Sequence, residues 1–101
     1  MLFRSHFDMV QALGKLPIDL NDVDLASFSA HKIYGLKGSG LLFKRRSTTI
    51  VPLISGGQQE FSLRGGTSNA CTNIVFAKTL RLASIICHSI KPLISFIIGS
   101  Y

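Results

Sequence analysis

The stretch from Val23 to Lys44 constrains the fold of this chain more than any other segment. It begins with VDLASF, whose loose alternation of apolar and polar residues predicts a strand. It continues through the polar residues 29–39, which glycines punctuate, and ends with the apolar run GLLFK at residues 40–44. That run predicts a second short strand, so the stretch favours a sheet joined by a glycine-rich turn.

The segments before this stretch predict another strand and a turn. Residues 2–7 are typical of the end of a strand that arrives at Asp8. Residues 9–13 then predict a short helical turn that Gly14 stops.

The segments after it are less regular until a helix begins. Residues 50–54 form a third apolar segment, and residues 56–67 form a long glycine-rich loop of a kind that is usually functional or disordered. Ser68 or Asn69 is placed to cap a helix over residues 70–83. The fold class is therefore α/β, with an incomplete sheet and a C-terminal helix, and the shortage of elements predicts that the chain is part of something larger.

Composition narrows the class of partner. The 101 residues are 47% apolar and 16% charged, which is a globular composition. The net charge of +6 permits a polyanion partner, but the cations are scattered and only residues 44–46 form a run, so we expect no nucleic acid. The two cysteines match no zinc or redox spacing, so we expect no metal site and a reduced, cytoplasmic setting.

The C-terminal stretch differs from the rest of the chain. Residues 80–98 are strongly apolar, but they are interrupted by Arg81, His88, Lys91 and Pro92, so we expect no membrane span. Nothing at the start predicts a signal peptide. We divide the chain into residues 1–83 and an anomalous apolar tail, residues 84–101. The tail is either a buried helix followed by a strand or the product of a disrupted reading frame, and its composition favours the second.

Five side chains that can do chemistry follow the two predicted strand ends. Asp8 follows the first apolar segment, with Gln11 three residues later, and Ser29, His31 and Lys32 follow the second. Ligands of open α/β sheets bind beyond the carboxyl ends of strands. We therefore expect an acid, an amide, a hydroxyl, an imidazole and an amine to converge there.

This inventory matches what pyridoxal phosphate requires of a protein. A lysine forms a Schiff base with the aldehyde, and a carboxylate facing the pyridine nitrogen keeps it protonated, so that the ring accepts electrons. An amide can donate to the phenolic oxygen, while hydroxyl and imidazole groups hold the phosphate.

Four stretches carry a resemblance to a known family. They are HFDMVQALGKLPIDL, VDLASFSAHKIYGLKGSGLLFKRR, PLISGGQQE and LRGGTSN. In order and spacing they resemble the cofactor-lysine region of cysteine desulfurases of the NifS/IscS-like branch, in the class V aminotransferase family. The resemblance covers roughly residues 6–78. It implies that residues 1–83 are a central fragment of the large pyridoxal-phosphate-binding domain of a fold-type I transferase.

The resemblance also implies roles for the five side chains. Lys32 would form the Schiff base, Asp8 would pair with the pyridinium nitrogen, and Gln11 would contact the phenolic oxygen. Ser29 and His31 would contact the phosphate.

One further implied role lies later in the chain. Thr67 would reach the phosphate bound in the neighbouring subunit, because members of the family are homodimers with shared sites. Arg64 is either a cation of the cofactor loop or an interface charge. The sequence departs from the family at Leu36, Gln58 and Gly65, where proline, glycine and serine are usual, and none of these changes removes an implied cofactor contact.

The implied activity is conversion of L-cysteine to L-alanine, with persulfide sulfur passed to iron–sulfur cluster or thio-cofactor assembly; a sulfur-acceptor protein would then be a partner. The family's nucleophilic cysteine lies far beyond the lysine, so neither Cys71 nor Cys87 is assigned to it. We therefore expect this chain to be inactive alone. A small basic binding module and a non-functional gene remnant are the alternatives.

Overall fold

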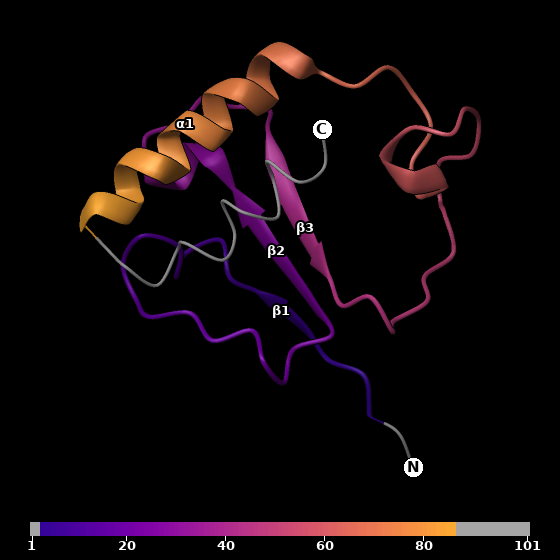
Figure 1. Cartoon of the computed structure of the whole chain (residues 1–101), viewed down its shortest axis with the longest axis horizontal. Coiled ribbons are helices and arrows are strands. Elements are labelled where there is room, and N and C mark those ends of the chain that lie inside the picture. The colour runs from indigo at the N-terminus through magenta and orange to yellow at the C-terminus, as the bar shows by residue number, and fades with distance from the viewer. Residues whose placement is uncertain (1–2, 87–101) are drawn as a thin grey trace.

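The computed structural model describes residues 3–86, which form a small sheet and one long helix (Figure 1). In chain order the elements are the strands β1 His6–Asp8 and β2 Leu25–Ser29, the 3₁₀ helix η1 Ala30–Ile33, the strand β3 Gly40–Lys44, the 3₁₀ helix η2 Glu60–Ser62 and the α-helix α1 Ala70–Ile86. The predicted tail lies, from residue 87 onward, outside the described residues. Within residues 3–86 no helix is long and apolar enough to cross a membrane.

The three strands form one mixed sheet in the order β1-β2-β3. β1 and β2 are parallel, with Asp8 opposite Ser27, whereas β2 and β3 are antiparallel, with Ser29 opposite Gly40. The glycine-punctuated residues 30–39 therefore connect an antiparallel pair, a direction that the sequence patterns left open. β3 has the predicted bounds, and β2 begins two residues later than predicted.

The connection from β1 to β2 contains the predicted turn. The amides of Ala12 and Leu13 both donate to the carbonyl of Met9, at 3.0 and 3.2 Å. The turn continues one residue past Gly14, since the Lys15 amide donates to the Ala12 carbonyl at 3.0 Å. Gly14 has φ +76°, and a Cβ at that position would meet Ile33 Cγ2 at 3.0 Å. A left-handed backbone against a packed side chain is a position that suits glycine.

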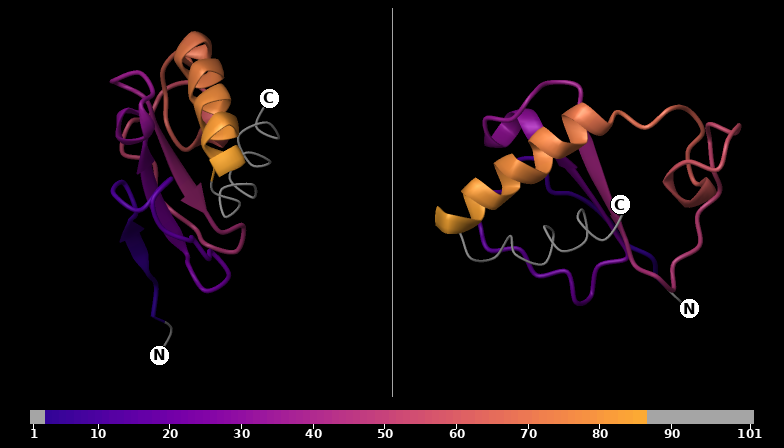
Figure 2. Two further views of the ribbon diagram at one scale, coloured as in Figure 1. Left: turned by 90° about the vertical axis from the view of Figure 1, so that its left-hand side faces the viewer. Right: turned by 45° about the horizontal axis from the view of Figure 1, so that its top comes forward.

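The sheet has one covered face and one open face. Along β2 the buried side chains of Ala26 and Phe28 alternate with half-buried Leu25, Ser27 and Ser29, as the two-residue period of a strand requires. The helix α1 lies across the buried face only (Figure 2, left).

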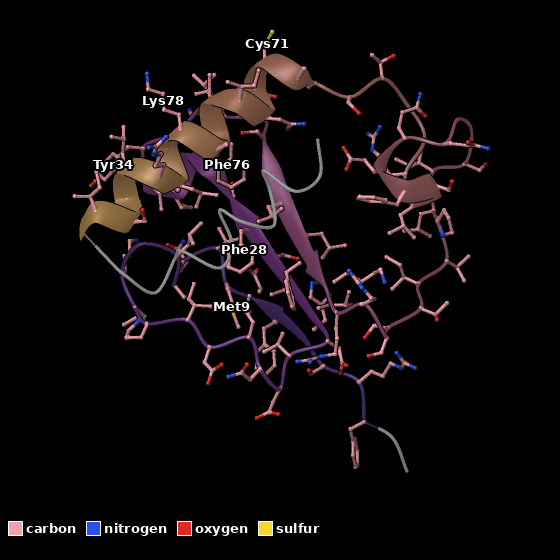
Figure 3. The ribbon with its side chains drawn as sticks, viewed as in Figure 1. Met9, Phe28, Tyr34, Cys71, Phe76 and Lys78 are labelled. Carbon is pink, nitrogen blue, oxygen red and sulfur yellow. The ribbon has the colours of Figure 1, made fainter. Side chains whose placement is uncertain are left out.

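The core forms where that face meets α1. Phe28 points from the sheet and Phe76 from the helix into the space between them (Figure 3). Leu80, one turn after Phe76, is fully buried, and the loops contribute Leu13 and Val23.

The helix begins where the sequence predicts and ends three residues later than predicted. The amide of Thr72 donates to Asn69 Oδ1 at 3.3 Å, so Asn69 is the capping residue. The helix continues through Ile86 because residues 84–86 contain no glycine or proline. The boundary predicted between residues 83 and 84 thus falls within a helix, and the division of the chain there stays a prediction.

A polar cluster holds the sheet at the end opposite to Asp8 and Ser29. The Asp24 carboxylate accepts hydrogen bonds from the Ser5 amide at 2.9 Å and from the buried Thr48 hydroxyl at 3.2 Å. Arg45 donates to the carbonyls of Val23 at 3.0 Å and Leu20 at 2.9 Å. The Ser5 amide is the main cause that lowers the pKa of Asp24 below its usual 3.8; partial burial opposes it, and Thr48, the Ser5 hydroxyl and nearby Arg4 add to it.

The connection from β3 to α1, residues 45–69, projects away from the sheet (Figure 1). The third apolar segment predicted at residues 50–54 forms no strand, and Val51 and Leu53 are exposed. The loop is tied to itself through the Gly65 amide, which donates to the carbonyl of Ile54 at 2.7 Å. Residues 60–62 adopt three successive left-handed conformations, with φ between 50° and 62°.

Candidate functional site

The parallel pairing of β1 and β2 brings the two predicted strand ends to one edge of the sheet. Asp8 is the last residue of β1 and Ser29 the last residue of β2. Asp8 pairs with Ser27, so Asp8, Ser27 and Ser29 share the open face of the sheet, opposite to α1. The geometry therefore gives the predicted convergence a physical basis, because carboxyl ends of parallel strands point the same way.

Asp8 and Gln11 are both exposed on the β1 side of this edge. Asp8 Oδ1 accepts a hydrogen bond from the Val10 amide at 3.1 Å, which fixes the start of the turn after β1. Gln11 Oε1 lies 3.5 Å from Lys15 Nζ, one helical turn later. The end of β1 and the turn after it thus carry an exposed carboxylate and an exposed amide.

Ser29, His31 and Lys32 lie on the β2 side. Ser29 Oγ and His31 Nδ1 are hydrogen-bonded at 2.7 Å, so a hydroxyl and an imidazole act as one polar unit. Lys32 follows in η1 and is half-buried. Its attachment to η1, which contacts α1 through the core, restricts how far the lysine backbone can move.

The residues of η1 and those just after it determine which side of this helix is buried and where it ends. Its buried residues Ala30 and Ile33 face the core, which leaves His31 and Lys32 on the outer side. Tyr34 ends the helix in a left-handed conformation, φ 64° and ψ 21°, and the amide of Gly35 donates to the Ala30 carbonyl at 2.9 Å. A Cβ on Gly35 would lie 2.8 Å from that carbonyl oxygen, so only glycine fits there without a shift.

Thr67 lies elsewhere, beside the start of α1. It is exposed and lines a shallow hollow of about 190 Å³ together with Glu60, Arg64, Gly66, Ser68, Asn69 and Asn73. None of the five strand-end residues lines this hollow. The Arg64 guanidinium donates to the neighbouring Gly65 carbonyl at 2.6 Å. The structure thus separates Thr67 and Arg64 from the strand-end residues within this chain.

The pair His6 and Ser27 is a feature of this face that the sequence patterns did not predict. His6 Nε2 and Ser27 Oγ are 2.7 Å apart and hydrogen-bonded between β1 and β2. A sequence signal for this pair was present, because alternate residues of a strand lie on the same face. His6 precedes Asp8 by two positions, and Ser27 precedes Ser29 by two.

Two further points of the sequence analysis are the cysteines and the possibility of a metal site. Cys71 is an exposed free thiol in the first turn of α1 (Figure 3). In the part of the chain that the structure describes, no three His, Cys, Asp or Glu side chains are grouped to hold a metal ion. Cys87 lies outside that part.

Comparisons with known proteins agree with the resemblance in the sequence. The family model "Aminotransferase class-V" matches residues 3–90. A cysteine desulfurase of Enterobacter agglomerans is 46% identical over 82 residues, which are 79% of this chain and 20% of that protein. The cysteine desulfurase IscS of Dictyoglomus turgidum is 48% identical over 80 residues, which are 77% of this chain and 20% of that protein. The chain thus spans about a fifth of the length of the curated relatives it matches.

Solved structures give the same result for the fold. A NifS-like protein has a TM-score of 0.75 at 45% sequence identity, over 79% of this chain and 22% of that one. A NifS-like protein from Rickettsia africae has a TM-score of 0.77 at 36% identity, over 81% of this chain and 23% of that one. SspA in complex with cysteine has a TM-score of 0.63 at 45% identity, over 77% and 22%. The predicted fold, an α/β fragment of a fold-type I domain, is therefore confirmed, and the chain belongs to the class V aminotransferase family.

Proposed function

We propose that this chain carries the cofactor-lysine segment of a pyridoxal-phosphate-dependent cysteine desulfurase, with Lys32 as the point of attachment. The observation that carries the proposal is the parallel pairing of β1 and β2, which puts Asp8 and the Ser29–Lys32 turn at one sheet edge. Identities of 46% and 48% to proteins named cysteine desulfurase support it.

The residues at this edge fit the cofactor in chemical type. Asp8, with one carboxylate oxygen used by the Val10 amide, would hold a proton at the pyridine nitrogen. Gln11 would donate its amide to the phenolic oxygen. The hydrogen-bonded Ser29 and His31 would bind the phosphate. When bound, pyridoxal phosphate supplies an electron sink for the substrate's α-carbon.

Lys32 would supply the amine, because the neutral amine of a lysine attacks an aldehyde carbon. Its side chain is half-buried on the outer side of η1. The buried side chains of Ala30 and Ile33 on either side fix η1 to the core. This chain's contribution at Lys32 would therefore be to fix the backbone that carries the amine and so to limit its travel.

The remaining features belong to the longer protein. The substrate would be L-cysteine, since the related SspA is solved in complex with cysteine, and the product would be L-alanine. Sulfur would leave on a cysteine outside this segment for an acceptor in iron–sulfur cluster assembly. We also propose a cytoplasmic homodimer in which Thr67 contacts the phosphate held by the partner subunit. Its exposure beside α1, apart from the strand-end residues, leaves it accessible to a second subunit.

The proposal is tested by trapping the cofactor on its lysine. The full chain is incubated with pyridoxal phosphate, reduced with borohydride and digested, and the modified peptide is identified by mass spectrometry. We expect the label at Lys32, and at least about a tenfold loss in Lys32→Ala, because the amine is the reacting group.

Lys37→Ala provides a matched control, since Lys37 is an exposed lysine on the same connection to β3. It should be labelled at Lys32 as strongly as the unaltered chain. Label spread evenly over Lys15, Lys37 and Lys78 would show that lysines react only by exposure, and the proposal would fail.

A further inference from the structure

We infer that His6 and Ser27 are positioning residues that hold Asp8 in place at the open face of the sheet. The inference rests on the proposed function for its significance, because Asp8 matters as the carboxylate that faces the cofactor. Its structural content, a side-chain tie between β1 and β2, stands on the geometry alone.

The attachment of β1 to the rest of the fold is weak. The strand has three residues, and all of them are exposed. Among residues 3–86 the core cluster takes its buried members from β2, η1, α1 and the loops, and none from β1. Apolar packing therefore does little to fix β1, and its position depends on hydrogen bonds.

Besides its ladder with β2, β1 is flanked by one backbone hydrogen bond at each end. At its start, the Ser5 carbonyl accepts from the Leu25 amide at 3.0 Å. At its end, the amide of Met9, the residue after Asp8, donates to the Ser27 carbonyl at 3.0 Å. Between them, the His6–Ser27 side-chain bond of 2.7 Å crosses from one strand to the other.

The location of this side-chain bond connects it to Asp8. Ser27 is the residue opposite Asp8, and His6 is two positions before Asp8 on the same face. The His6 imidazole thus holds the hydroxyl of Ser27, the residue that lies opposite Asp8. A one-residue slip of β1 would turn Asp8 to the other face of the sheet. The slip would also separate His6 from Ser27, so the bond opposes it.

The experiment measures how well β1 is held, and it needs no cofactor. Amide hydrogen exchange at Met9 is followed by NMR in the full chain and in Ser27→Ala and His6→Ala. We expect exchange to be faster by about fivefold in each variant, which corresponds to loss of one hydrogen bond. The double variant should exchange no faster than either single variant, because both substitutions remove the same bond.

Conservative variants guard against a loss of folding. Ser27→Thr retains the hydroxyl and His6→Gln retains a side chain that can donate or accept a hydrogen bond, so both should exchange at Met9 within about twofold of the unaltered chain. Ser47→Ala, which removes an exposed hydroxyl after β3, is the matched control and should change nothing. Additive effects of the two alanine substitutions, or unchanged exchange at Met9, would overturn the inference.

A second measurement separates this inference from the proposed function. Equilibrium binding of pyridoxal phosphate should weaken by about fivefold in Ser27→Ala and be restored in Ser27→Thr. If the unaltered chain did not bind pyridoxal phosphate, the proposed function would be contradicted. Hydrogen exchange at Met9 would then test the His6–Ser27 bond by itself. Equal binding by all variants, despite faster exchange at Met9, would show that the tie does not position Asp8.

Discussion

The sheet with α1 and the connection at residues 45–69 contain similar apolar side chains and use them in opposite ways. In the first region Phe28 and Phe76 close a core and Leu80 is fully buried. In the second, Val51 is 84% exposed, Leu53 98% and Phe61 73%. Apolar content alone therefore does not make a core, because burial requires a second layer that faces the first.

The same contrast divides the candidate site. Ser29, His31 and Lys32 are attached to the packed region through β2 and η1, and Asp8 is held by the pairing of β1 with β2. Thr67 lies near the end of the exposed connection, in which the described hydrogen bonds of residues 54–65 join those residues to one another. The sheet edge is thus preorganised within this chain, whereas the position of Thr67 depends more on what else contacts it.

Removing a core side chain should give the largest difference between the two regions. Leu80→Ala deletes a fully buried side chain between α1 and the sheet and should lower the free energy of unfolding by about 2–5 kcal/mol. Urea unfolding followed by circular dichroism measures the change. Leu82→Ala, on the exposed side of the same helix, is the control and should cost less than about 1 kcal/mol. Equal losses would show that α1 does not cover the sheet as described.

Acid should weaken the packed region through Asp24. Because the folded state lowers the pKa of this carboxyl, its contribution to stability is present above the usual value of 3.8 and is lost as pH falls through the lower folded value. Asp24→Asn should therefore lose stability at neutral pH and show a flatter decline on acidification. Thermal melts between about pH 3 and about pH 7 measure both effects.

Asp22→Asn is the matched control, since Asp22 is an exposed carboxylate two residues away. Its melting temperature should follow that of the unaltered chain at every pH. An identical acid response in Asp24→Asn and the unaltered chain would contradict the role given to the cluster around Ser5 and Thr48.

Sequence patterns predicted the packed region well because its elements are set by local signals. GLLFK between turn residues indicated the bounds of β3, and Asn69 before an apolar run indicated the start of α1. β2 begins later than predicted because Val23 closes a turn, in which its amide donates to the Leu20 carbonyl. The Val23 carbonyl accepts a hydrogen bond from Arg45. The Arg45 partner lies far away in sequence, so strand alternation does not reveal it.

The candidate site was predictable to the extent that it follows strand ends. Convergence of Asp8 and Ser29 required only that their strands be parallel neighbours. The His6–Ser27 bond also needed the register, which sequence periodicity alone does not give. The left-handed conformation of Tyr34 was not predictable either, since nothing about tyrosine favours it.

A change in the exposed connection should have the smallest effect and the opposite sign. Phe61 adopts φ 55° and ψ 38°, between Glu60 and Ser62, which are also left-handed. A side chain costs about 1–2 kcal/mol in this conformation, while glycine costs about 0.5–1 kcal/mol in unfolded-chain entropy. Phe61→Gly should therefore raise the free energy of unfolding by about 0.5–1 kcal/mol in urea titrations. Phe61→Ala, which removes the ring and keeps the Cβ, is the control and should gain nothing. A loss of stability in Phe61→Gly would mean that the exposed ring packs against something, and the contrast between the two regions would then be weaker than their exposure suggests.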